Sequence, residues 1–575
     1  MSSLSSDAAV AQTLQAAWQA YACGDLATAK QHAQRLLRMA PASAAGLHLA
    51  GRVEYQLQNY RAAADLLARA VKLNPASAAC LIDLGTVFSA SGESEQAIEA
   101  YKKATVVSPS QAEPWFHLGV AYQAKGSLDN AIDAYRQAIA IEPGVAKYYD
   151  ALGTVLYQMQ HFDDAMVSYR KGLSLHSASP ALYHHLGIAL QAQGNLLDAE
   201  RAFLEALALD EQNPEVHYNL ALTYEHQENW ATASASYAQA IELDPAYVNA
   251  LIGLGRVCAE EGEYQRAVNA YQRAIKRDPR AQEAHVNLGR VLVEAKMLEK
   301  AAVCFKNALI LDANDVSACE ELGGIYKELD QPEEAEVYYN KAIELGSPLA
   351  RHFLAAMKHE KTEAAPQQYV KELFDYYSTD FERHLLETLK YRIPDVLYKA
   401  FARVYRGNKP ISKSVDLGCG TGLAGLAFKP IVTRIDGVDL SSEMLKKAQV
   451  KGIYAKLHNV GIVEYLNNCA ENYDLFIAAD VLTYIGNLAP LFATVKECAT
   501  RGAFFVFSIE RAYGEDFLLQ PSGRYAHSSE YIRGLAQANN FYVLTCRPTL
   551  LRKEEQHWVR GILVILKYLG KDENY

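Results

Sequence analysis

Residues 414–422 read Ser-Val-Asp-Leu-Gly-Cys-Gly-Thr-Gly, a short apolar run that ends in three glycines at alternate positions. A glycine turn between a strand and a helix lets backbone N–H groups approach a bound molecule closely at the helix N-terminus. A dinucleotide-binding turn would have a further glycine at position 423, where this chain has Leu423. The stretch therefore predicts a nucleotide-type cofactor site that is not of the NAD kind.

The sequence on both sides of this turn alternates β-branched runs with helical stretches. This alternation favours a doubly wound, mainly parallel sheet. The last two runs have no helix between them and predict an antiparallel hairpin at the sheet edge. The predicted strands cover residues 414–417, 434–438, 473–478, 503–507, 541–546 and 561–567.

An acidic residue follows the second predicted strand. Asp439 comes nineteen residues after Gly420, so the two should meet at the carboxyl edge of the sheet. A carboxylate at that place can accept hydrogen bonds from both hydroxyls of a ribose.

The chain before the turn repeats itself every 34 residues. Helix pairs of this period bury their apolar faces only against neighbouring pairs, so we expect a curved solenoid over residues 10–349. The small residues should lie where two helices approach, with an aromatic side chain filling the gap toward the neighbouring unit. The period is carried by Gly51, Gly85, Gly119, Gly153, Gly187, Ala221, Gly255, Gly289 and Gly323, by an alanine twelve residues after each, and by a large apolar residue four positions later.

The predicted domain organisation has four parts. Residues 1–9 form an N-terminal tail, 10–349 form ten repeats, 350–366 form a capping helix and linker, and 367–575 form the α/β domain. The linker is short, so the two domains should pack against each other.

Charge and cysteine content narrow the class of ligand. Residues 1–366 carry 30 Lys and Arg against 44 Asp and Glu, a net charge of −14, which argues against nucleic acid and mildly favours a basic or neutral partner. Nine scattered cysteines without a C-x-x-C pair fit a reducing cytoplasm and argue against a structural metal. No apolar run is long enough for a membrane span.

Two known families share these patterns. The repeats resemble tetratricopeptide (TPR) repeats, and Asp416-x-Gly418-x-Gly420-x-Gly422 with Asp439 resembles class I S-adenosylmethionine (AdoMet) methyltransferases. Residues 374–385 are similar to the lead helix of bacterial TPR-fused methyltransferases, F-D-x-Y-A-x-x-F-D-x-H-L, with Glu382 in place of an aspartate. The resemblance implies an all-α TPR superhelix followed by a Rossmann-like methyltransferase domain that uses AdoMet and releases S-adenosylhomocysteine.

The resemblance also implies which residues hold the cofactor. Tyr377 and Phe381 would cover it, although both could be core aromatics. Relatives have an aspartate for the adenine near the third strand, where this chain has His458-Asn459, which leaves Asn459 or a backbone group for that contact. The full predicted set is Tyr377, Phe381, Asp416, Gly418, Cys419, Gly420, Gly422, Asp439, Leu440, Met444, Asn459, Asp480 and Val481, with no metal ligand.

Three residues are candidates for proton transfer or for orienting the acceptor. Asp480 follows the predicted strand 473–478 at the ligand edge, where it could equally cap the next helix. Tyr484 could stack over the site or simply pack. His527 is predicted in a loop before a helix and could take a proton near neutral pH, or be a surface loop histidine.

The sequence supports three hypotheses for function. A TPR groove could bring a protein or peptide acceptor to the methyltransferase domain, or tether an enzyme that acts on a small metabolite. The third hypothesis is a scaffold with an inactive domain, against which the intact Asp416, Gly418, Gly420 and Asp439 argue. Groove-facing positions are mixed in character, so peptide capture, self-association and spacing all stay open, as does the oligomeric state.

Overall fold

The computed structural model describes residues 2–377, 381–407, 409–554 and 557–570, without the side chains of residues 2–7, 376 and 377. The chain divides into two compact units, Met1–Val291 and Leu292–Tyr575. The first contains solenoid helices only. The second contains the last solenoid helices together with the α/β domain.

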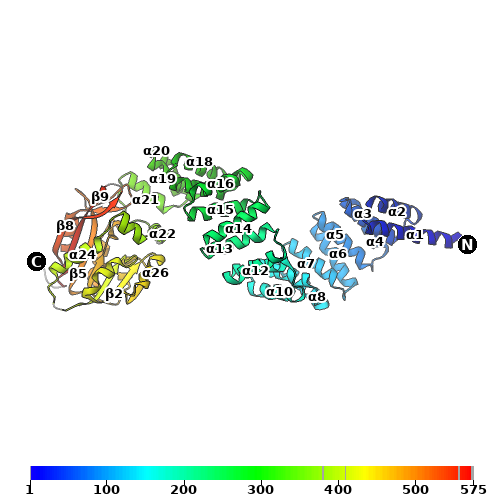
Figure 1. Ribbon diagram of the computed structural model, residues 1–575, viewed down its shortest axis with the longest axis horizontal. Helices are drawn as coiled ribbons and strands as arrows, with labels where there is room; N and C mark the ends of the chain where they lie inside the picture. The colour runs from blue at the N-terminus through cyan, green and yellow to red at the C-terminus, as the bar shows by residue number, and fades with distance from the viewer. Residues whose placement is uncertain (1, 378–380, 408, 555–556, 571–575) are drawn as a thin grey trace. The chain divides into compact units, whose positions relative to one another are not determined.

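The described solenoid consists of ten antiparallel helix pairs and one further helix (Figure 1). Pair follows pair along the chain, as the period of 34 residues predicts. The helices are α1 (Ser2–Ala22), α2 (Leu26–Met39), α3 (Ala44–Gln56), α4 (Tyr60–Leu73), α5 (Ala78–Ala90), α6 (Ser94–Val107), α7 (Ala112–Ala124), α8 (Leu128–Ile141), α9 (Ala146–Gln158), α10 (Phe162–Leu175), α11 (Pro180–Ala192), α12 (Leu196–Leu209), α13 (Pro214–His226), α14 (Trp230–Leu243), α15 (Val248–Glu260), α16 (Tyr264–Arg277), α17 (Gln282–Glu294), α18 (Leu298–Leu311), α19 (Val316–Glu328), α20 (Pro332–Glu344) and α21 (Pro348–Met357).

Close helix contact explains the repeated glycines. A Cβ added to Gly119 would lie 2.6 Å from the ring of Tyr135, which is itself fully buried. The aromatic ring thus packs first on the glycine of its own unit, and it also reaches the next one, since Tyr101 stacks 5.5 Å from His117. The expected gap-filling toward the neighbour is only part of its role.

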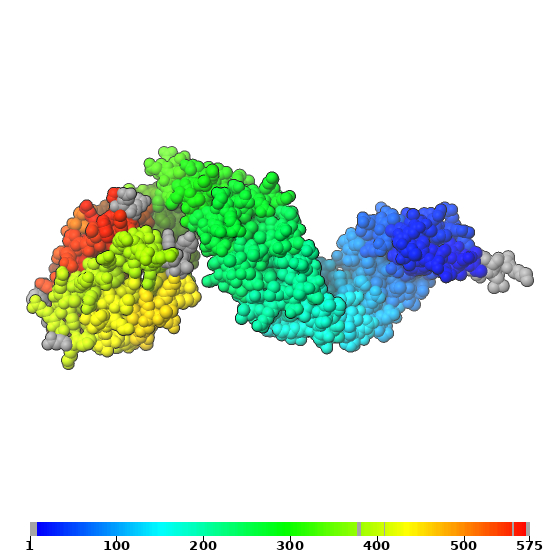
Figure 2. Space-filling model, in the orientation of Figure 1, coloured from blue at the N-terminus to red at the C-terminus, as the bar shows by residue number. Residues whose placement is uncertain are grey.

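The α/β domain is built on a sheet of nine described strands. Seven of them lie in the order β3-β2-β1-β4-β5-β7-β6, and the other two, β8 and β9, join the sheet through β5. Strands β1 to β5 are parallel, while β9 pairs antiparallel with β5 and with β8. The predicted terminal hairpin is present. Figure 2 shows the orange-red C-terminal segment that contains it on the visible face of this domain, together with the yellow segment. The strands are β1 (Ile411–Leu417), β2 (Val432–Asp439), β3 (Lys456–Asn459), β4 (Tyr473–Ala478), β5 (Ala499–Arg511), β6 (Phe517–Leu519), β7 (Tyr525–His527), β8 (Phe541–Glu554) and β9 (His557–Tyr568).

Helices cover both faces of this sheet, and the carboxyl halves of β1, β2 and β4 are accordingly buried. In β4, Phe476 packs into a core on one face, and Leu475 and Ile477 pack into a second core on the other. Some buried positions within the strands are nevertheless polar, such as Ser414, Asp416 and Asp436. The helices are α22 (Gln367–Tyr377), α23 (Phe381–Arg383), the π-helix η1 (His384–Thr388), α24 (Ile393–Val404), α25 (Leu423–Phe428), η2 (Lys429–Ile431), α26 (Ser442–Val450), α27 (Ile462–Asn467), η3 (Leu482–Tyr484), α28 (Ala489–Glu497) and α29 (Ser529–Ala538).

The linker between α21 and α22 is bonded to the α/β domain. The Ala365 N–H donates to the Tyr484 carbonyl at 3.0 Å, and the N–H groups of Gly486 and Asn487 donate to the Glu363 carbonyl at 2.8 and 2.9 Å. The linker therefore runs as a short strand-like partner along the loop that follows β4.

Candidate active site

A cavity of about 740 Å³ opens at the carboxyl ends of β1, β2 and β4. Helix α22 and the π-helix η1 contribute its apolar cover. The cavity is lined by Tyr369, Val370, Leu373, Phe374, Phe381, His384, Leu385, Leu389, Tyr391, Pro394, Gly418, Cys419, Gly420, Thr421, Leu423, Ala424, Asp439, Leu440, Val460, Ile462, Ala479, Asp480, Val481, Thr483, Tyr484, Ser522, Arg524, Arg552 and Glu554.

The glycine turn has a left-handed backbone at all three glycines, with φ of +71° at Gly418, +52° at Gly420 and +94° at Gly422. Gly418 has a second requirement, because an added Cβ would lie 2.3 Å from the Val481 side chain. An added Cβ at Gly420 would meet nothing within 4 Å. The backbone of Gly420 thus borders the open cavity and leaves room for a ligand.

Asp439 lies directly against this turn. Its Oδ2 accepts a hydrogen bond from the Gly420 N–H at 2.8 Å, and its Oδ1 accepts one from the Ser441 N–H at 2.9 Å. Each oxygen of a carboxylate has two lone pairs, so both keep one for a ligand hydroxyl. Burial raises the pKa of Asp439, while the backbone N–H groups favour its charged form.

Asp416 supports the turn from behind and does not line the cavity. It is fully buried, and its Oδ2 accepts a hydrogen bond from the Tyr454 hydroxyl at 2.6 Å. Burial raises the pKa of Asp416 to about 7. Its Oδ1 has no hydrogen-bond partner among the described residues.

The remaining predicted cofactor residues fall into two groups. Phe381, Cys419, Leu440, Asp480 and Val481 line the cavity, whereas Gly422, Met444 and Asn459 do not. The side chain of Tyr377 lies outside the described residues.

Asn459 is occupied with a structural contact. Its side-chain amide donates to the carbonyls of Asp439 and Leu440, at 3.2 and 2.8 Å. Met444 is fully buried in α26. The residues near β3 that reach the cavity are Val460 and Ile462. The contact of Asn459 or a backbone group with adenine stays a prediction.

Asp480 belongs to a buried ion network. Both of its oxygens accept hydrogen bonds from Nη1 of Arg552, at 3.0 and 2.8 Å. The other nitrogens of Arg552 donate to Glu510 and Glu554. Burial raises the pKa of Asp480 and Arg552 opposes this effect. Arg552 thus fixes the orientation of the Asp480 carboxylate at the cavity wall.

Tyr484 also lines the cavity. Its ring meets that of Phe374 edge-on, with centroids 5.5 Å apart. Burial raises the pKa of Tyr484, so the side chain stays a phenol at neutral pH and can donate a hydrogen bond.

His527 requires a correction, because the structure places it away from the cavity. It is the last residue of β7 and not a loop residue, and it is fully buried. Its Nε2 lies 2.9 Å from the carbonyls of both Ile485 and Gly486. Burial lowers the pKa of His527 to about 4. His527 is not among the residues that line the cavity, so its ring is not placed to accept a proton from a substrate there.

Sequence reasoning missed the polar residues on the far side of the cavity. Arg552 and Glu554 come from β8, and Ser522 and Arg524 come from the turn between β6 and β7. Arg524 donates to Glu554, which joins it to the Asp480 network. No local motif marks these residues, because they meet only through the pairing of distant strands.

Comparisons with known proteins agree with this architecture. Models of TPR repeats match residues 85–126 and 316–345, and the model of the cilia and flagella-associated protein 70 C-terminal domain matches residues 116–322. A methyltransferase domain model matches residues 415–505. That match begins in β1 and ends in β5, so it includes Gly418, Gly420 and Asp439.

One curated relative and several solved structures are similar to parts of the chain. Human methyltransferase-like protein 27 is 31% identical over 85 residues, which are 15% of this chain and 34% of the relative. The chain thus matches about a third of that relative's length. YrrB, described as a TPR protein with an unusual peptide-binding site, matches 33% of the chain with 97% of its own length, at 24% identity and a TM-score of 0.29. MamA covers 28% with 95% of its length, at 25% identity and a TM-score of 0.27.

Fold, site and comparisons together define the class of protein. The chain is a TPR solenoid fused to a Rossmann-like methyltransferase domain. No helix among the described residues has both the length and the apolarity to cross a bilayer. The described His, Cys, Asp and Glu side chains form no group suited to a metal ion.

Proposed function

We propose that the chain is an AdoMet-dependent methyltransferase whose TPR solenoid binds a protein or peptide partner. The contact between the Gly420 N–H and the Asp439 carboxylate, at the edge of an open cavity, carries this proposal. It pairs backbone donors with a carboxylate that has free lone pairs, which suits a ribose. The apolar walls beside it suit the rest of a nucleoside.

AdoMet, when bound, would supply a methyl group on a sulfonium, and the neutral thioether that remains makes it a good donor. Asp439 would accept from the ribose hydroxyls, and the Gly420 backbone would border the amino-acid part. Phe381 and Leu440 would cover the ligand and exclude water. Transfer is an in-line displacement, so the main tasks of the protein are alignment and desolvation.

The acceptor would enter from the side of Tyr484 and Arg524. Tyr484 offers a phenol hydroxyl, and Arg524 holds Glu554 at this wall. These groups can orient a nucleophile through hydrogen bonds without taking its proton.

The nine described cysteines are free, which accords with our placing the enzyme in a reducing cytoplasm.

Transfer of a labelled methyl group tests the proposal and sorts the acceptors. The full chain is incubated with methyl-labelled AdoMet and a cell lysate, and the products are separated into macromolecular and small-molecule fractions. We expect label in the protein fraction, and its loss when S-adenosylhomocysteine is added in excess. Label in the small-molecule fraction alone would replace the protein acceptor by a metabolite. No transfer, together with no binding of AdoMet, would leave a scaffold with an inactive domain.

A further inference from the structure

We call the side of the cavity lined by Tyr484, Ser522, Arg524 and Glu554 the acceptor wall. The turn between β6 and β7 forms part of this wall. The Gln520 N–H donates to the Arg524 carbonyl at 2.8 Å, and the Gly523 N–H donates to the Gln520 carbonyl at 2.8 Å. Ser522 and Arg524 of this turn line the cavity. The position of the turn backbone therefore decides where the Arg524 guanidinium lies.

Two residues from the solenoid helices hold this turn. The Nε2 of His352, in α21, lies 2.9 Å from the Gly523 carbonyl and donates to it. The Lys327 Nζ, in α19, donates to the Pro521 carbonyl at 3.0 Å and lies 4.7 Å above the Phe353 ring. His352 is only 2% exposed, so its hydrogen bond does not compete with water.

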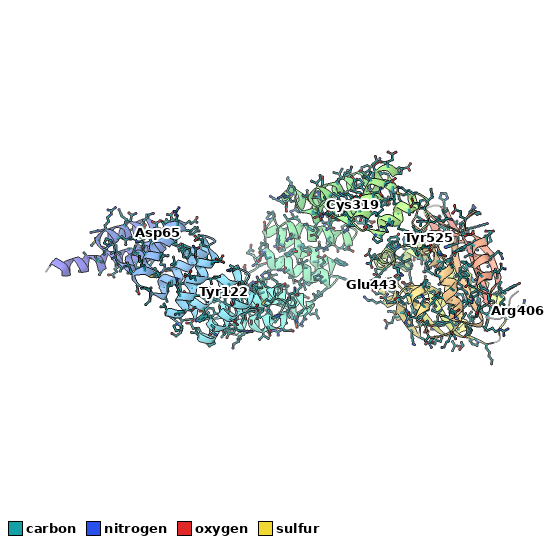
Figure 3. All side chains as sticks on the ribbon, turned by 180° about the vertical axis from the view of Figure 1, so that it is seen from behind. Asp65, Tyr122, Cys319, Arg406, Glu443 and Tyr525 are labelled. Carbon is teal, nitrogen blue, oxygen red and sulfur yellow. The ribbon has the colours of Figure 1, made fainter. Side chains whose placement is uncertain are left out.

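Packing restricts the turn further. A Cβ added to Gly523, where φ is +80°, would lie 2.9 Å from the Phe353 ring. The Phe353 ring also meets Tyr369 edge-on at 5.5 Å, and Tyr369 lines the cavity. Figure 3 labels Tyr525, the first residue after the turn, on the side of the α/β domain beside the last solenoid helices. The His352 ring lies 5.9 Å from the Tyr525 ring.

A continuous series of polar contacts leads from His352 into the site. His352 holds Gly523, the next residue Arg524 donates to Glu554, and Glu554 also accepts from Arg552. Arg552 in turn holds both oxygens of Asp480. A shift of the turn would therefore move Arg524 relative to the Asp480 network. It would leave Gly420 and Asp439 in place, since Gly420 lies in the turn after β1 and Asp439 ends β2.

We propose that His352 and Lys327 are positioning residues of the acceptor wall, which they maintain by fixing Arg524. The inference rests on the proposed function and deepens it. The end of the solenoid is then a part of the methyl-transfer site itself, and its removal would disturb the acceptor side while sparing the cofactor side.

Hydrogen exchange of the full chain tests the positioning without any acceptor. His352→Phe keeps an aromatic ring but removes the donor, whereas His352→Gln restores a donor. We expect the Gln520 and Gly523 amides to exchange at least about tenfold faster in His352→Phe, because a buried carbonyl loses its partner. His352→Gln and the exposed-site control His226→Phe should exchange like the wild type. Unchanged exchange in His352→Phe would overturn the proposal.

A double-mutant cycle tests whether His352 acts through Arg524. The readout is transfer of labelled methyl groups to the lysate fraction that the wild-type chain labels, with S-adenosylhomocysteine affinity measured in parallel. His352→Phe should lower transfer about tenfold, since small misplacements in such sites are costly, while the affinity changes less than about twofold. His352→Gln should recover most of the transfer. Lys327→Met should also lower transfer, but less than His352→Phe does, and Lys327→Arg should restore it.

Non-additivity decides the outcome of this cycle. If His352 serves only to place Arg524, the double variant His352→Phe/Arg524→Gln should transfer no more slowly than Arg524→Gln alone. Losses that multiply would show a separate structural role and overturn the proposal. Absence of transfer by the wild-type chain would refute the proposed function instead, and the exchange experiment would still decide the positioning role.

Discussion

The solenoid and the α/β domain bury different kinds of residues. In the solenoid, the buried positions hold small and aromatic side chains such as Gly119 against Tyr135, and its ion pairs lie near the surface. Among the described residues, the charged side chains that are almost fully buried are Asp416, Asp436, Glu510 and Arg552, all in the α/β domain.

This difference separates two uses of a core. A repeat needs only shape complementarity to its neighbours, so its buried positions recur and carry no charge. A reaction site tolerates buried charges because neighbouring charges compensate them, and such compensated clusters are often functional. The distribution of buried charge thus distinguishes the solenoid from the α/β domain, in line with our proposal that the first binds a partner and the second carries out the reaction.

Removal of the central cation should produce the largest change in stability. Arg552→Met leaves the carboxylates of Asp480 and Glu510 buried without their partner, which should destabilise the α/β domain by about 3–5 kcal/mol. Arg256→Met in the solenoid is the matched control. Arg256 pairs with Glu225 and Glu283 and its side chain is 37% exposed, so the loss should be about 0–1 kcal/mol.

Urea unfolding followed by hydrogen exchange reports on strand β5 and on the solenoid helices separately. Equal losses in Arg552→Met and Arg256→Met would show that the contrast between the two regions is not energetic.

Acid should destabilise both regions through buried histidines. Burial lowers the pKa of His184 in the solenoid and of His527 in the α/β domain to about 4, from 6.5. The unfolded chain takes up a proton below pH 6.5 and the folded chain does so only near pH 4. The contribution of each neutral histidine to the free energy of unfolding is therefore fully present above pH 6.5. It is lost as the pH drops toward 4, by up to about 3 kcal/mol for each histidine.

Phenylalanine variants separate the two contributions. His184→Phe should flatten the pH dependence of the solenoid helices only, and His527→Phe that of the sheet only. A pH dependence that persists unchanged in both variants would assign it to other groups.

Glycine substitutions should have smaller effects on stability than the loss of Arg552. Gly119→Ala forces a Cβ to within 2.6 Å of the Tyr135 ring and should cost about 1–3 kcal/mol by overpacking, with no effect on S-adenosylhomocysteine binding. Gly420→Ala meets no neighbour and should cost about 1 kcal/mol through its positive φ. Its methyl group borders the cavity, however, so it should weaken binding. Thermal unfolding and calorimetry measure the two effects, and reversed effects would contradict the assignment of the two glycines.

Local patterns predicted much of this molecule. The 34-residue period indicated the helix pairs, and the glycine turn with Asp439 indicated the contact at the edge of the sheet, because spacing along the chain determines both. His527 was misplaced because β7 has only three residues, too few for an alternating pattern, and its burial depends on pairing with β5 and β6.

Residues of the acceptor wall could not be predicted in this way. Arg552 is separated from Asp480 by 72 residues, and only the antiparallel pairing of β8 with β9, and of β9 with β5, brings the two together. The hydrogen bond from His352 to the Gly523 carbonyl joins a solenoid helix to a distant turn. No sequence motif predicts this contact.

Calorimetric titration of the full chain with S-adenosylhomocysteine tests the central claim most directly. We predict one binding site in the wild-type chain and at least about 100-fold weaker binding in Asp439→Ala, since two hydrogen bonds to a charged group are lost. Asp395→Ala, at an exposed position in α24, should bind like the wild type. Absence of a heat of binding in the wild-type titration, or unchanged affinity in Asp439→Ala, would contradict the assignment of the turn and its carboxylate as the nucleoside site.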